Sequence, residues 1–461
     1  MRIFITILLF SLLGALIPLF QILNWTGQSW RGILPEYADD SLYYYARLHE
    51  VADKHPFFGN PYFLEHNQEP SVSTYGADWL GSIPWLWHLP PFLAATFNMS
   101  IWSLMTNLVG YYLLRKMGLS KIGALVGCIL LFLQLYKFLM RPVFLQTVLA
   151  PMLLFYLTYF MMGRQLSKRH QILLAIILGF NFYIYPYFFL AQIATVGLML
   201  VWYALKRDYP RLIKIITLLF LSLVVMFPGL IYQYAQLSHP FYSQTVHRIN
   251  WSDTYFPTVS AFFYSFWIVI SLAMLYIKRA KHNHFFFTTG LALILVNFSN
   301  VVSGREMETA NHIGRLVIIW VTLFVMVNRK FLKASLLSFG YWVLILSFIV
   351  SNISYSLGVL GAPTKQATIE IQDYAAPLNW LEAKVNSPSV IWSNLPLSFY
   401  IPIYTKHYVL FSPEGGLHLM PSQEVSQRYL IARYFDNLTL TDIERDYRQY
   451  AGTGPAIHHP G

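Results

Sequence analysis

Charged residues are scarce in this chain, and cysteine is nearly absent. Only 11% of the 461 residues are charged, whereas a soluble domain carries roughly a quarter, so the composition excludes an ordinary globular protein. Cys128 is the one cysteine and lies in an apolar segment, which excludes a disulfide framework and a thiolate metal site. Hydrophobic residues make up 56% of the chain and gather in runs of about 20, enough to cross a hydrocarbon layer. The sequence predicts a polytopic α-helical membrane protein.

The Lys and Arg residues that give the chain its net charge of +11 are clustered in short connectors between apolar runs. This placement is typical of the cytoplasmic loops of membrane proteins and argues against a nucleic-acid partner. The connectors alternate with stretches poor in basic residues. We therefore expect an integral protein of the cytoplasmic membrane, with its N-terminus in the cytoplasm and its C-terminus outside. The basic connectors are residues 115–121, 163–170, 206–214, 278–284 and 328–333.

About eleven transmembrane helices are expected. The first, residues 3–23, is too long for a cleaved signal peptide and is interpreted as a retained span. A long outer loop, residues 24–80, follows it. Gly81–Ser100 is interrupted by prolines and rich in tryptophan, which favours a helix lying at the membrane interface. The other spans are expected near residues 101–114, 122–136, 143–162, 171–185, 187–205, 212–233, 258–277, 285–302, 313–327 and 334–357.

The composition changes after about residue 360. Residues 1–360 are interpreted as the transmembrane domain, and residues 361–461 as a small extracytoplasmic α/β domain. Within the latter, two short buried strands are expected at 389–394 and 408–412, with a crossover element between them. An amphipathic helix is expected at 421–435, and Thr441–Glu444 has the capping-box pattern of a further helix. The chain stops without a closing element, as expected of a domain that continues in a longer natural protein.

The stretch "PEYADDSLYYYARLHE" places two adjacent carboxylates shortly after the first span. If it is helical, Asp40, Tyr44 and Arg47 share one face, and Asp39 points about 100° away, beside Tyr43. One interpretation is helix capping by both aspartates, with Arg47 in an intrahelical ion pair. The other is a functional site, because paired acids near hydrocarbon are costly unless they are used.

The motif, the first span, the long outer loop, the interfacial segment and the outer domain together resemble the GT-C class of integral-membrane glycosyltransferases. "YADDSLYYYAR" is similar to the acidic first-loop motif of that class, in which an aspartate precedes aromatic residues. The resemblance implies sugar transfer from a polyprenyl-phosphate or polyprenyl-pyrophosphate carrier to a glycan, lipid or protein acceptor at the outer face of the bilayer. It assigns Asp39 as the catalytic base and Asp40 as a supporting residue. Tyr43, Tyr44 and Arg47 are the substrate-binding residues that follow.

Such a transfer needs a carboxylate near the acceptor's proton and positive charge near the departing phosphate. Two outer connectors carry basic residues on the side that such residues normally avoid. Arg315 begins a span, where a guanidinium can grip a lipid phosphate, although simple anchoring of a loop at the headgroups is the alternative. The candidates for the donor phosphate are Arg305, Glu306, His312 and Arg315 in one connector, Lys137 and Arg141 in the other, and, as weaker candidates, His247 and Arg248.

In some GT-C enzymes an acidic first-loop residue also holds a divalent metal ion, which makes Asp39 a candidate ligand. The chain has no second clear Asp-x-Asp pair, so no metal and no cofactor is assigned. Residues 65–70 and 74–79 add carboxylates and amides to the first loop, and a solvated loop surface is the favoured interpretation for them.

Two other functions stay open. A transporter or flippase of lipid-linked sugars should carry polar residues or broken helices at the membrane midplane, whereas polar residues here gather in outer loops, which favours the enzyme. A non-catalytic membrane protein of glycan assembly is the third function. The motifs do not specify the sugar, the number of carrier phosphates or the acceptor.

Overall fold

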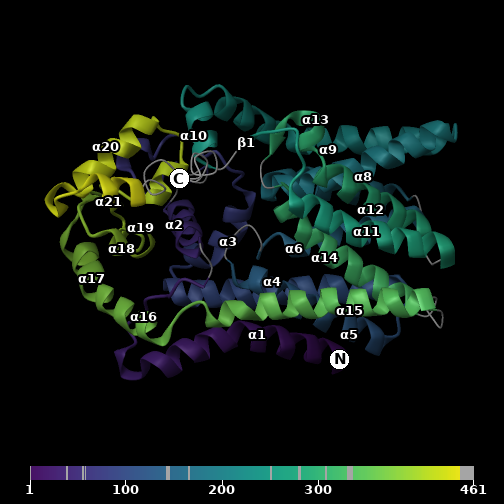
Figure 1. The fold of residues 1–461 in the computed structure, drawn as a ribbon, viewed down its shortest axis with the longest axis horizontal. Coiled ribbons are helices and arrows are strands. Elements are labelled where there is room, and N and C mark those ends of the chain that lie inside the picture. The colour runs from purple at the N-terminus through teal and green to yellow at the C-terminus, as the bar shows by residue number, and fades with distance from the viewer. Residues whose placement is uncertain are drawn as a thin grey trace. The chain divides into compact units, whose positions relative to one another are not determined.

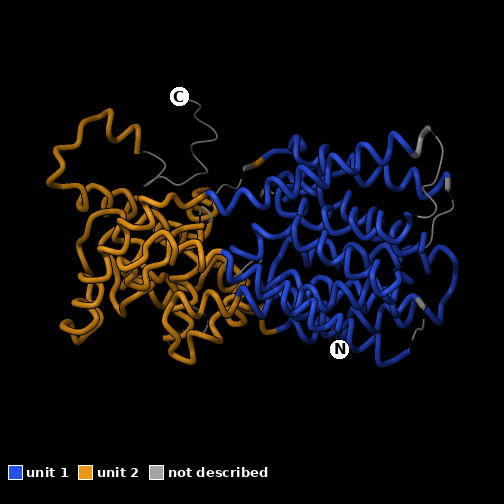
Figure 2. The backbone as a smooth tube through the Cα atoms, turned by 90° about the horizontal axis from the view of Figure 1, so that it is seen from below, with its two compact units in different colours: residues 1–17, 99–227, 254–361 blue, residues 18–98, 228–253, 362–461 orange. Residues whose placement is uncertain are grey.

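The computed structural model is mostly helical, and its elements divide into two compact units (Figure 1; Figure 2). Unit 1 comprises residues 1–17, 99–227 and 254–361, and unit 2 comprises residues 18–98, 228–253 and 362–461. The structure describes residues 2–37, 40–53, 55, 57, 59–141, 146–164, 167–249, 252–278, 282–306, 309–329 and 336–446.

The chain passes between the units within three helices, α1 (Arg2–Thr26), α4 (Pro91–Lys116) and α9 (Tyr209–Leu237). In α1 and α9 the segment of unit 2 begins at an internal proline, Pro18 in one and Pro228 in the other. A proline inside a helix removes one backbone hydrogen bond and bends the helix. The division of the chain therefore follows features that are visible in the sequence.

Unit 1 is built around α14 (Thr309–Asn328), whose residues are almost all buried and which packs against α5, α8, α11 and α12. Close helix packing depends on small residues: a Cβ atom at Gly290 would lie 2.8 Å from the Trp320 ring. The other elements of unit 1 are α5 (Lys121–Met140), α6 (Leu149–Arg164), α7 (Lys168–Ile184), α8 (Pro186–Leu205), α11 (Val259–Lys278), α12 (Asn283–Asn297), α13 (Asn300–Ser303), β2 (Arg305–Glu306) and α15 (Leu336–Leu357).

Eight helices of the described residues are long and apolar enough to cross a membrane: α1, α4, α5, α8, α9, α11, α14 and α15. The remaining three expected spans coincide with α6, α7 and α12, which have only 16, 17 and 15 residues. The polytopic helical membrane protein is therefore confirmed, whereas the count of eleven spans stays a prediction.

The interfacial helix expected over Gly81–Ser100 is wrong in its second half. α3 (Gly76–Leu86) ends before the proline pair, and α4 begins at Pro91 and continues as one 26-residue helix to Lys116. A proline is tolerated in the first turn of a helix, because the N–H that it lacks has no intrahelical acceptor there. The prolines therefore mark the start of a span instead of interrupting a helix.

Four of the five basic connectors meet at one end of unit 1. His282 Nε2 lies 3.1 Å from the Met117 carbonyl oxygen, which joins two connectors. Gly163, Lys206 and His282 line one cavity, which brings in the other two. The basic residues are thus gathered in space as well as along the sequence, as the positive-inside rule predicts.

Unit 2 contains the first long loop and the C-terminal residues. Two strands, β3 (Val390–Ile391) and β4 (Tyr408–Val409), pair in parallel, with short helices between them. Both strands fall within the predicted segments but are much shorter. The other elements of unit 2 are α2 (Ser41–Ala52), α3, α10 (Tyr242–Arg248), β1 (Ser252–Asp253), α16 (Lys365–Glu370), α17 (Ala375–Lys384), α18 (Leu395–Ser398), α19 (Ile401–Tyr404), α20 (Ser422–Ala432) and α21 (Leu440–Arg445).

The capping box predicted at Thr441–Glu444 is wrong by two residues. Thr439 is the N-cap of α21, and its hydroxyl and the Asp442 carboxylate each accept a hydrogen bond from the other's backbone N–H. The sequence offers the pattern in two frames, and Thr439 has the extended backbone that a cap requires.

The residues after 361 share their compact unit with residues 18–98 and 228–253. Backbone and side-chain hydrogen bonds join them to the first loop: Val409 N–H donates to the Tyr62 carbonyl oxygen at 2.8 Å, and Asn60 Nδ2 donates to the Gly415 carbonyl oxygen at 2.8 Å. The C-terminal segment and the loop that carries the acidic motif are therefore packed together.

Candidate functional site

The acidic motif opens helix α2. Asp40 is the N-cap residue, is partly buried, and its carbonyl oxygen accepts a hydrogen bond from Tyr44 N–H at 3.2 Å. Its side chain makes no capping hydrogen bond to the described first turn of α2, so the capping interpretation has no such bond to support it. Asp39 lies outside the described residues, and its assignment stays a prediction.

Arg47 is buried and bound to a carboxylate that the sequence did not single out. Its Nε and Nη2 atoms donate to the two carboxylate oxygens of Asp78 at 3.0 and 2.6 Å, and the two side chains are 1% and 0% exposed. The rings of Tyr43 and Tyr44 lie 5.3 and 5.5 Å from the guanidinium carbon. The expected pairing of Arg47 within its own helix is therefore wrong, as is the solvated surface expected for Asp78.

The pair joins α2 to α3, because Asp78 lies in the first turn of α3. Burial raises the pKa of Asp78 to about 6, although the facing Arg47 lowers it, so the carboxylate is charged at neutral pH. Removing one partner of such a buried pair costs about 3–5 kcal/mol, because the other charge is left unpaired. Arg47 and Asp78 thus fix the helix that Asp40 precedes as its N-cap residue.

A second group of titratable residues lies in the segment "SPEGGLHLM" of the same unit. His418 is 1% exposed, its ring centre lies 5.7 Å from that of Tyr43, and neither ring nitrogen has a hydrogen-bond partner among the described residues. Burial lowers the pKa of His418 to about 3, so the imidazole is neutral. Burial also raises the pKa of Glu414 to about 7, against a hydrogen bond that Ser412 Oγ donates at 2.9 Å. Only a weak sequence signal marks these residues, namely two polar positions in a glycine-containing loop.

Arg248 holds this loop in place. It donates to the Gly416, His418 and Met420 carbonyl oxygens at 2.8, 3.1 and 2.9 Å and to Ser422 Oγ at 2.7 Å. Burial lowers the pKa of Arg248 to about 10, which leaves the guanidinium charged at neutral pH. All of these acceptors belong to the protein, so the structure gives Arg248 a scaffold role.

The leading candidates for the donor phosphate lie in unit 1, whereas the weaker candidates His247 and Arg248 belong to unit 2. Arg315 Nη1 donates to the Tyr185 hydroxyl at 3.0 Å and lies 3.1 Å from His312 Nδ1, while its Cζ atom lies 4.8 Å from the centre of the Phe138 ring. The Tyr185 hydroxyl also contacts His312 Nδ1, and the Tyr187 ring stacks on the His312 ring at 4.1 Å. We name Tyr185, Tyr187, His312 and Arg315 the Arg315 cluster.

The Arg315 cluster lies at the end of unit 1 opposite to the basic connectors. α5 starts and α8 ends at those connectors, whereas Phe138 is near the end of α5 and Tyr185 precedes α8. Sequence analysis predicted His312 and Arg315 but missed both tyrosines, for which the only signal is "YIYPY" at the start of a span. Neither hydrogen-bond partner of Arg315 carries a negative charge at neutral pH.

The other predicted residues are placed differently. Glu306 is 7% exposed, and its Oε1 atom accepts the Thr309 N–H at 3.0 Å, which stabilises the start of α14. Arg305 is exposed in β2. Lys137 Nζ donates to the Tyr355 hydroxyl at 3.1 Å, and Arg141 ends α5 as its C-cap residue.

Metal binding by the described residues finds no support. Among them there is no group of three His, Cys, Asp or Glu side chains that could hold a metal ion. Because Asp39 is not among the described residues, a divalent ion at that position stays a prediction.

Comparison with known structures shows which fold the chain resembles. No protein-family profile and no curated protein matches the sequence. The crystal structure of ArnT from Cupriavidus metallidurans bound to undecaprenyl phosphate aligns over 88% of this chain and 85% of that chain, with a TM-score of 0.54 at 13% sequence identity. The chain has a GT-C-like fold.

The oligosaccharyltransferase of Archaeoglobus fulgidus is a more distant match. Its structure with a tethered acceptor peptide aligns over 99% of this chain and 72% of that chain, with a TM-score of 0.47 at 12% identity. The alignment with ArnT confirms the resemblance of this chain to the GT-C class at the level of the fold, and its chemistry has to be argued from its own residues.

Proposed function

We propose that this protein is a glycosyltransferase that moves a sugar from a polyprenyl-phosphate or polyprenyl-pyrophosphate carrier to an acceptor at the outer face of the membrane. The observation that carries the proposal is the Arg315 cluster. In a GT-C-like fold, it sets a cation with no acidic partner among the described residues at the end of unit 1 away from the basic connectors. A carrier phosphate is the anion that such a site would meet at a membrane surface.

We propose one role in the transfer for Asp39 and another for Arg315. Asp39 takes the proton of the acceptor hydroxyl or amide, whose heteroatom forms the new bond to the anomeric carbon of the donor sugar. The bond from that carbon to the phosphate oxygen breaks, and the carrier phosphate leaves with the bonding electrons. Arg315 offsets the charge of the departing phosphate, and Tyr185 orients the guanidinium through its hydroxyl.

The C-terminal residues are proposed to help recognise the acceptor. They pack on α2, the helix that the acidic motif opens: His49 Nδ1 in α2 lies 2.9 Å from the Pro402 carbonyl oxygen in α19. The segment that we propose for acceptor recognition therefore packs on the helix that follows the acidic motif.

The direct test is a transfer assay with the purified, full-length protein in proteoliposomes. The probes are radiolabelled sugars linked to undecaprenyl phosphate, offered together with a membrane extract as the source of acceptor. We expect free undecaprenyl phosphate to appear together with label in a new product, and Asp39→Asn to abolish both. Movement of intact, labelled carrier across the bilayer without cleavage would instead identify a flippase.

The outer-face assignment has its own test, which the chain makes simple because Cys128 is buried. A membrane-impermeant maleimide applied to intact cells should label Asn311→Cys, an exposed position next to the Arg315 cluster, but not Lys168→Cys at the basic end. The reverse pattern would place the cluster in the cytoplasm and contradict the outer-face assignment.

A further inference from the structure

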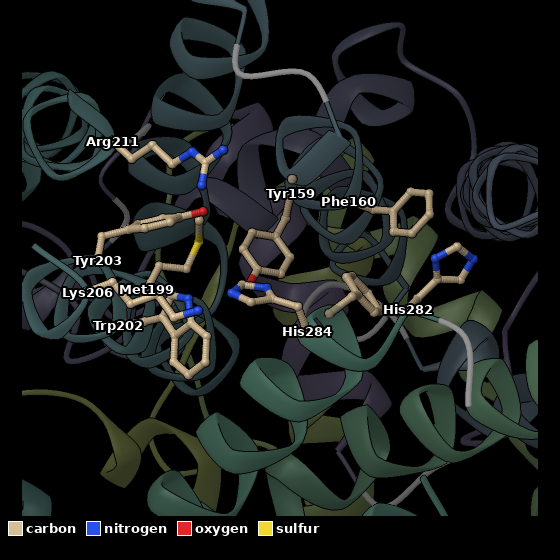
Figure 3. Close-up of a pocket in the computed structure, with 11 residues that line it drawn as sticks. Tyr159, Phe160, Met199, Trp202, Tyr203, Lys206, Arg211, His282 and His284 are labelled. Carbon is tan, nitrogen blue, oxygen red and sulfur yellow. The ribbon is translucent and has the colours of Figure 1, made fainter. Parts of the chain in front are cut away.

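A cavity of about 360 Å³ lies at the end of unit 1 where the basic connectors meet (Figure 3). Its lining combines aromatic and basic side chains from α6, α8, α9 and α12, among them Trp202, Lys206, Arg211 and His284. The proposed transfer uses none of these residues, because the Arg315 cluster lies at the opposite end of unit 1.

The cavity is cationic. Lys206 Nζ lies over the Trp202 ring at 4.4 Å from its centre, and no carboxylate partner of Lys206 is recorded among the described residues. Arg211 is paired with Asp208 at 3.1 Å, but its side chain stays 55% exposed. The side chains of Lys206, Arg211 and Asp208 together carry one net positive charge. The Trp202 ring orients the ammonium group of Lys206 without neutralising it.

A second cavity, of about 520 Å³, adjoins the first and is lined mostly by apolar side chains, with Asn283, His284 and Thr288 as its polar members. The two share Trp202 and His284, whose rings lie 5.8 Å apart in an edge-to-face arrangement. This second cavity forms a groove along α8, α11 and α12, and Leu198, Val201 and Leu275 are among the residues that line it. Val201 is 53% exposed, so the groove is open to the surroundings of the helices.

We infer that the two cavities form one binding site for an anionic phospholipid, with the phosphate headgroup at Lys206 and an acyl chain in the groove. A cationic recess continuous with an apolar groove matches a lipid, whose charge and hydrocarbon are joined in one molecule. Basic pockets between transmembrane helices on the cytoplasmic side recognise anionic headgroups in this way. A zwitterionic phospholipid brings a cation next to Lys206 and is disfavoured.

The test is native mass spectrometry of the purified, full-length protein with equimolar phosphatidylglycerol and phosphatidylcholine of matched acyl chains. We expect preferential retention of phosphatidylglycerol. Lys206→Gln should reduce that preference about fivefold, the effect of one basic residue at a charged membrane surface, and Lys206→Arg should keep it. Lys168→Gln is the matched control, because Lys168 is exposed at the same end of unit 1 but does not line the cavity.

The groove is tested separately. Val201→Trp fills it without touching a basic residue and should lower retention of both lipids, whereas Val269→Trp, at a 54% exposed position of α11 outside both cavities, should not. Equal losses in Lys206→Gln and Lys168→Gln would overturn the site. Displacement of phosphatidylglycerol by glycerol phosphate at equal concentration would also overturn it, because the groove would then contribute nothing.

Discussion

The two units handle positive charge in different ways. In unit 2, arginines face carboxylates: Arg47 faces Asp78, and Arg428 binds Glu65 and Glu424, each at 2.8 Å. In unit 1, Lys137, Lys206 and Arg315 lie against the rings of Tyr355, Trp202 and Phe138. An aromatic ring holds a cation in position but does not cancel its charge.

This difference suggests a division of labour. Arg47 and Arg428 of unit 2 are paired with carboxylates of the protein, and these pairs stabilise the fold of that unit. Lys137, Lys206 and Arg315 of unit 1 have no carboxylate partner among the described residues, although Arg211 of the same unit pairs with Asp208. Substitutions of the cations test this difference. In unit 1 they should change activity, and in unit 2 they should change stability.

The largest effect is expected at Asp39, which we propose as the catalytic base. Asp39→Asn should lower sugar transfer by about 10²–10⁴, the usual cost of a lost general base, and Asp40→Asn should have a smaller effect. Asparagine caps helices about as well as aspartate, so insertion and folding should be unchanged. Near-normal transfer by the double variant Asp39→Asn, Asp40→Asn would contradict the catalytic assignment.

In unit 1, Arg315→Ala should lower transfer by about 10²–10³, the usual loss when one donor to a developing oxyanion is removed. Arg315→Lys should recover part of it, because lysine keeps the charge but loses the planar fork. The apparent Tm should change little, since a ring contact and two neutral partners are lost. A collapse of the Tm with Arg315→Ala would mean that this cation supports the fold, and the comparison between the units would fail.

In unit 2, Arg47→Ala should destabilise the protein by about 3–5 kcal/mol by leaving Asp78 buried and unpaired. Replacing both partners, as Arg47→Met with Asp78→Leu, should restore much of the loss. The measurement is the apparent Tm in detergent. The control is Arg445→Ala, whose side chain is 62% exposed and whose loss should leave the Tm nearly unchanged.

The smallest effect is a pH dependence at Glu414, whose pKa burial raises from 4.5 to about 7. A carboxyl with a raised folded-state pKa contributes stability that is present below its ordinary pKa and is lost as the pH rises through the folded value. Glu414→Gln removes that loss, so the variant should gain stability relative to the wild type between about pH 5 and pH 8, on the order of 1–3 kcal/mol. Glu444→Gln, an exposed carboxyl of α21, should show no such trend.

Much of the fold could be predicted because its signals are local. Hydrophobic run length predicted the helices that cross from one end of unit 1 to the other, and β-prone apolar segments predicted β3 and β4. Gly81–Ser100 was misjudged because a proline breaks a helix internally but starts one at its first turn, and composition does not distinguish the two positions. The boundary between the units was missed because α1, α4 and α9 belong to both.

The sequence by itself determined that this is a helical membrane protein whose basic residues gather in the connectors between apolar runs, because charge and hydrocarbon are segregated residue by residue along the chain. It left open whether a helix follows the acidic motif, and the structure shows that one does. Only the tertiary structure decided the partners: Arg47 binds Asp78, 31 positions away, and Arg315 binds Tyr185, 130 positions away. A guanidinium can donate hydrogen bonds to any carboxylate or hydroxyl that packing brings within about 3 Å. Which of these groups it meets depends on how helices far apart in the sequence pack together.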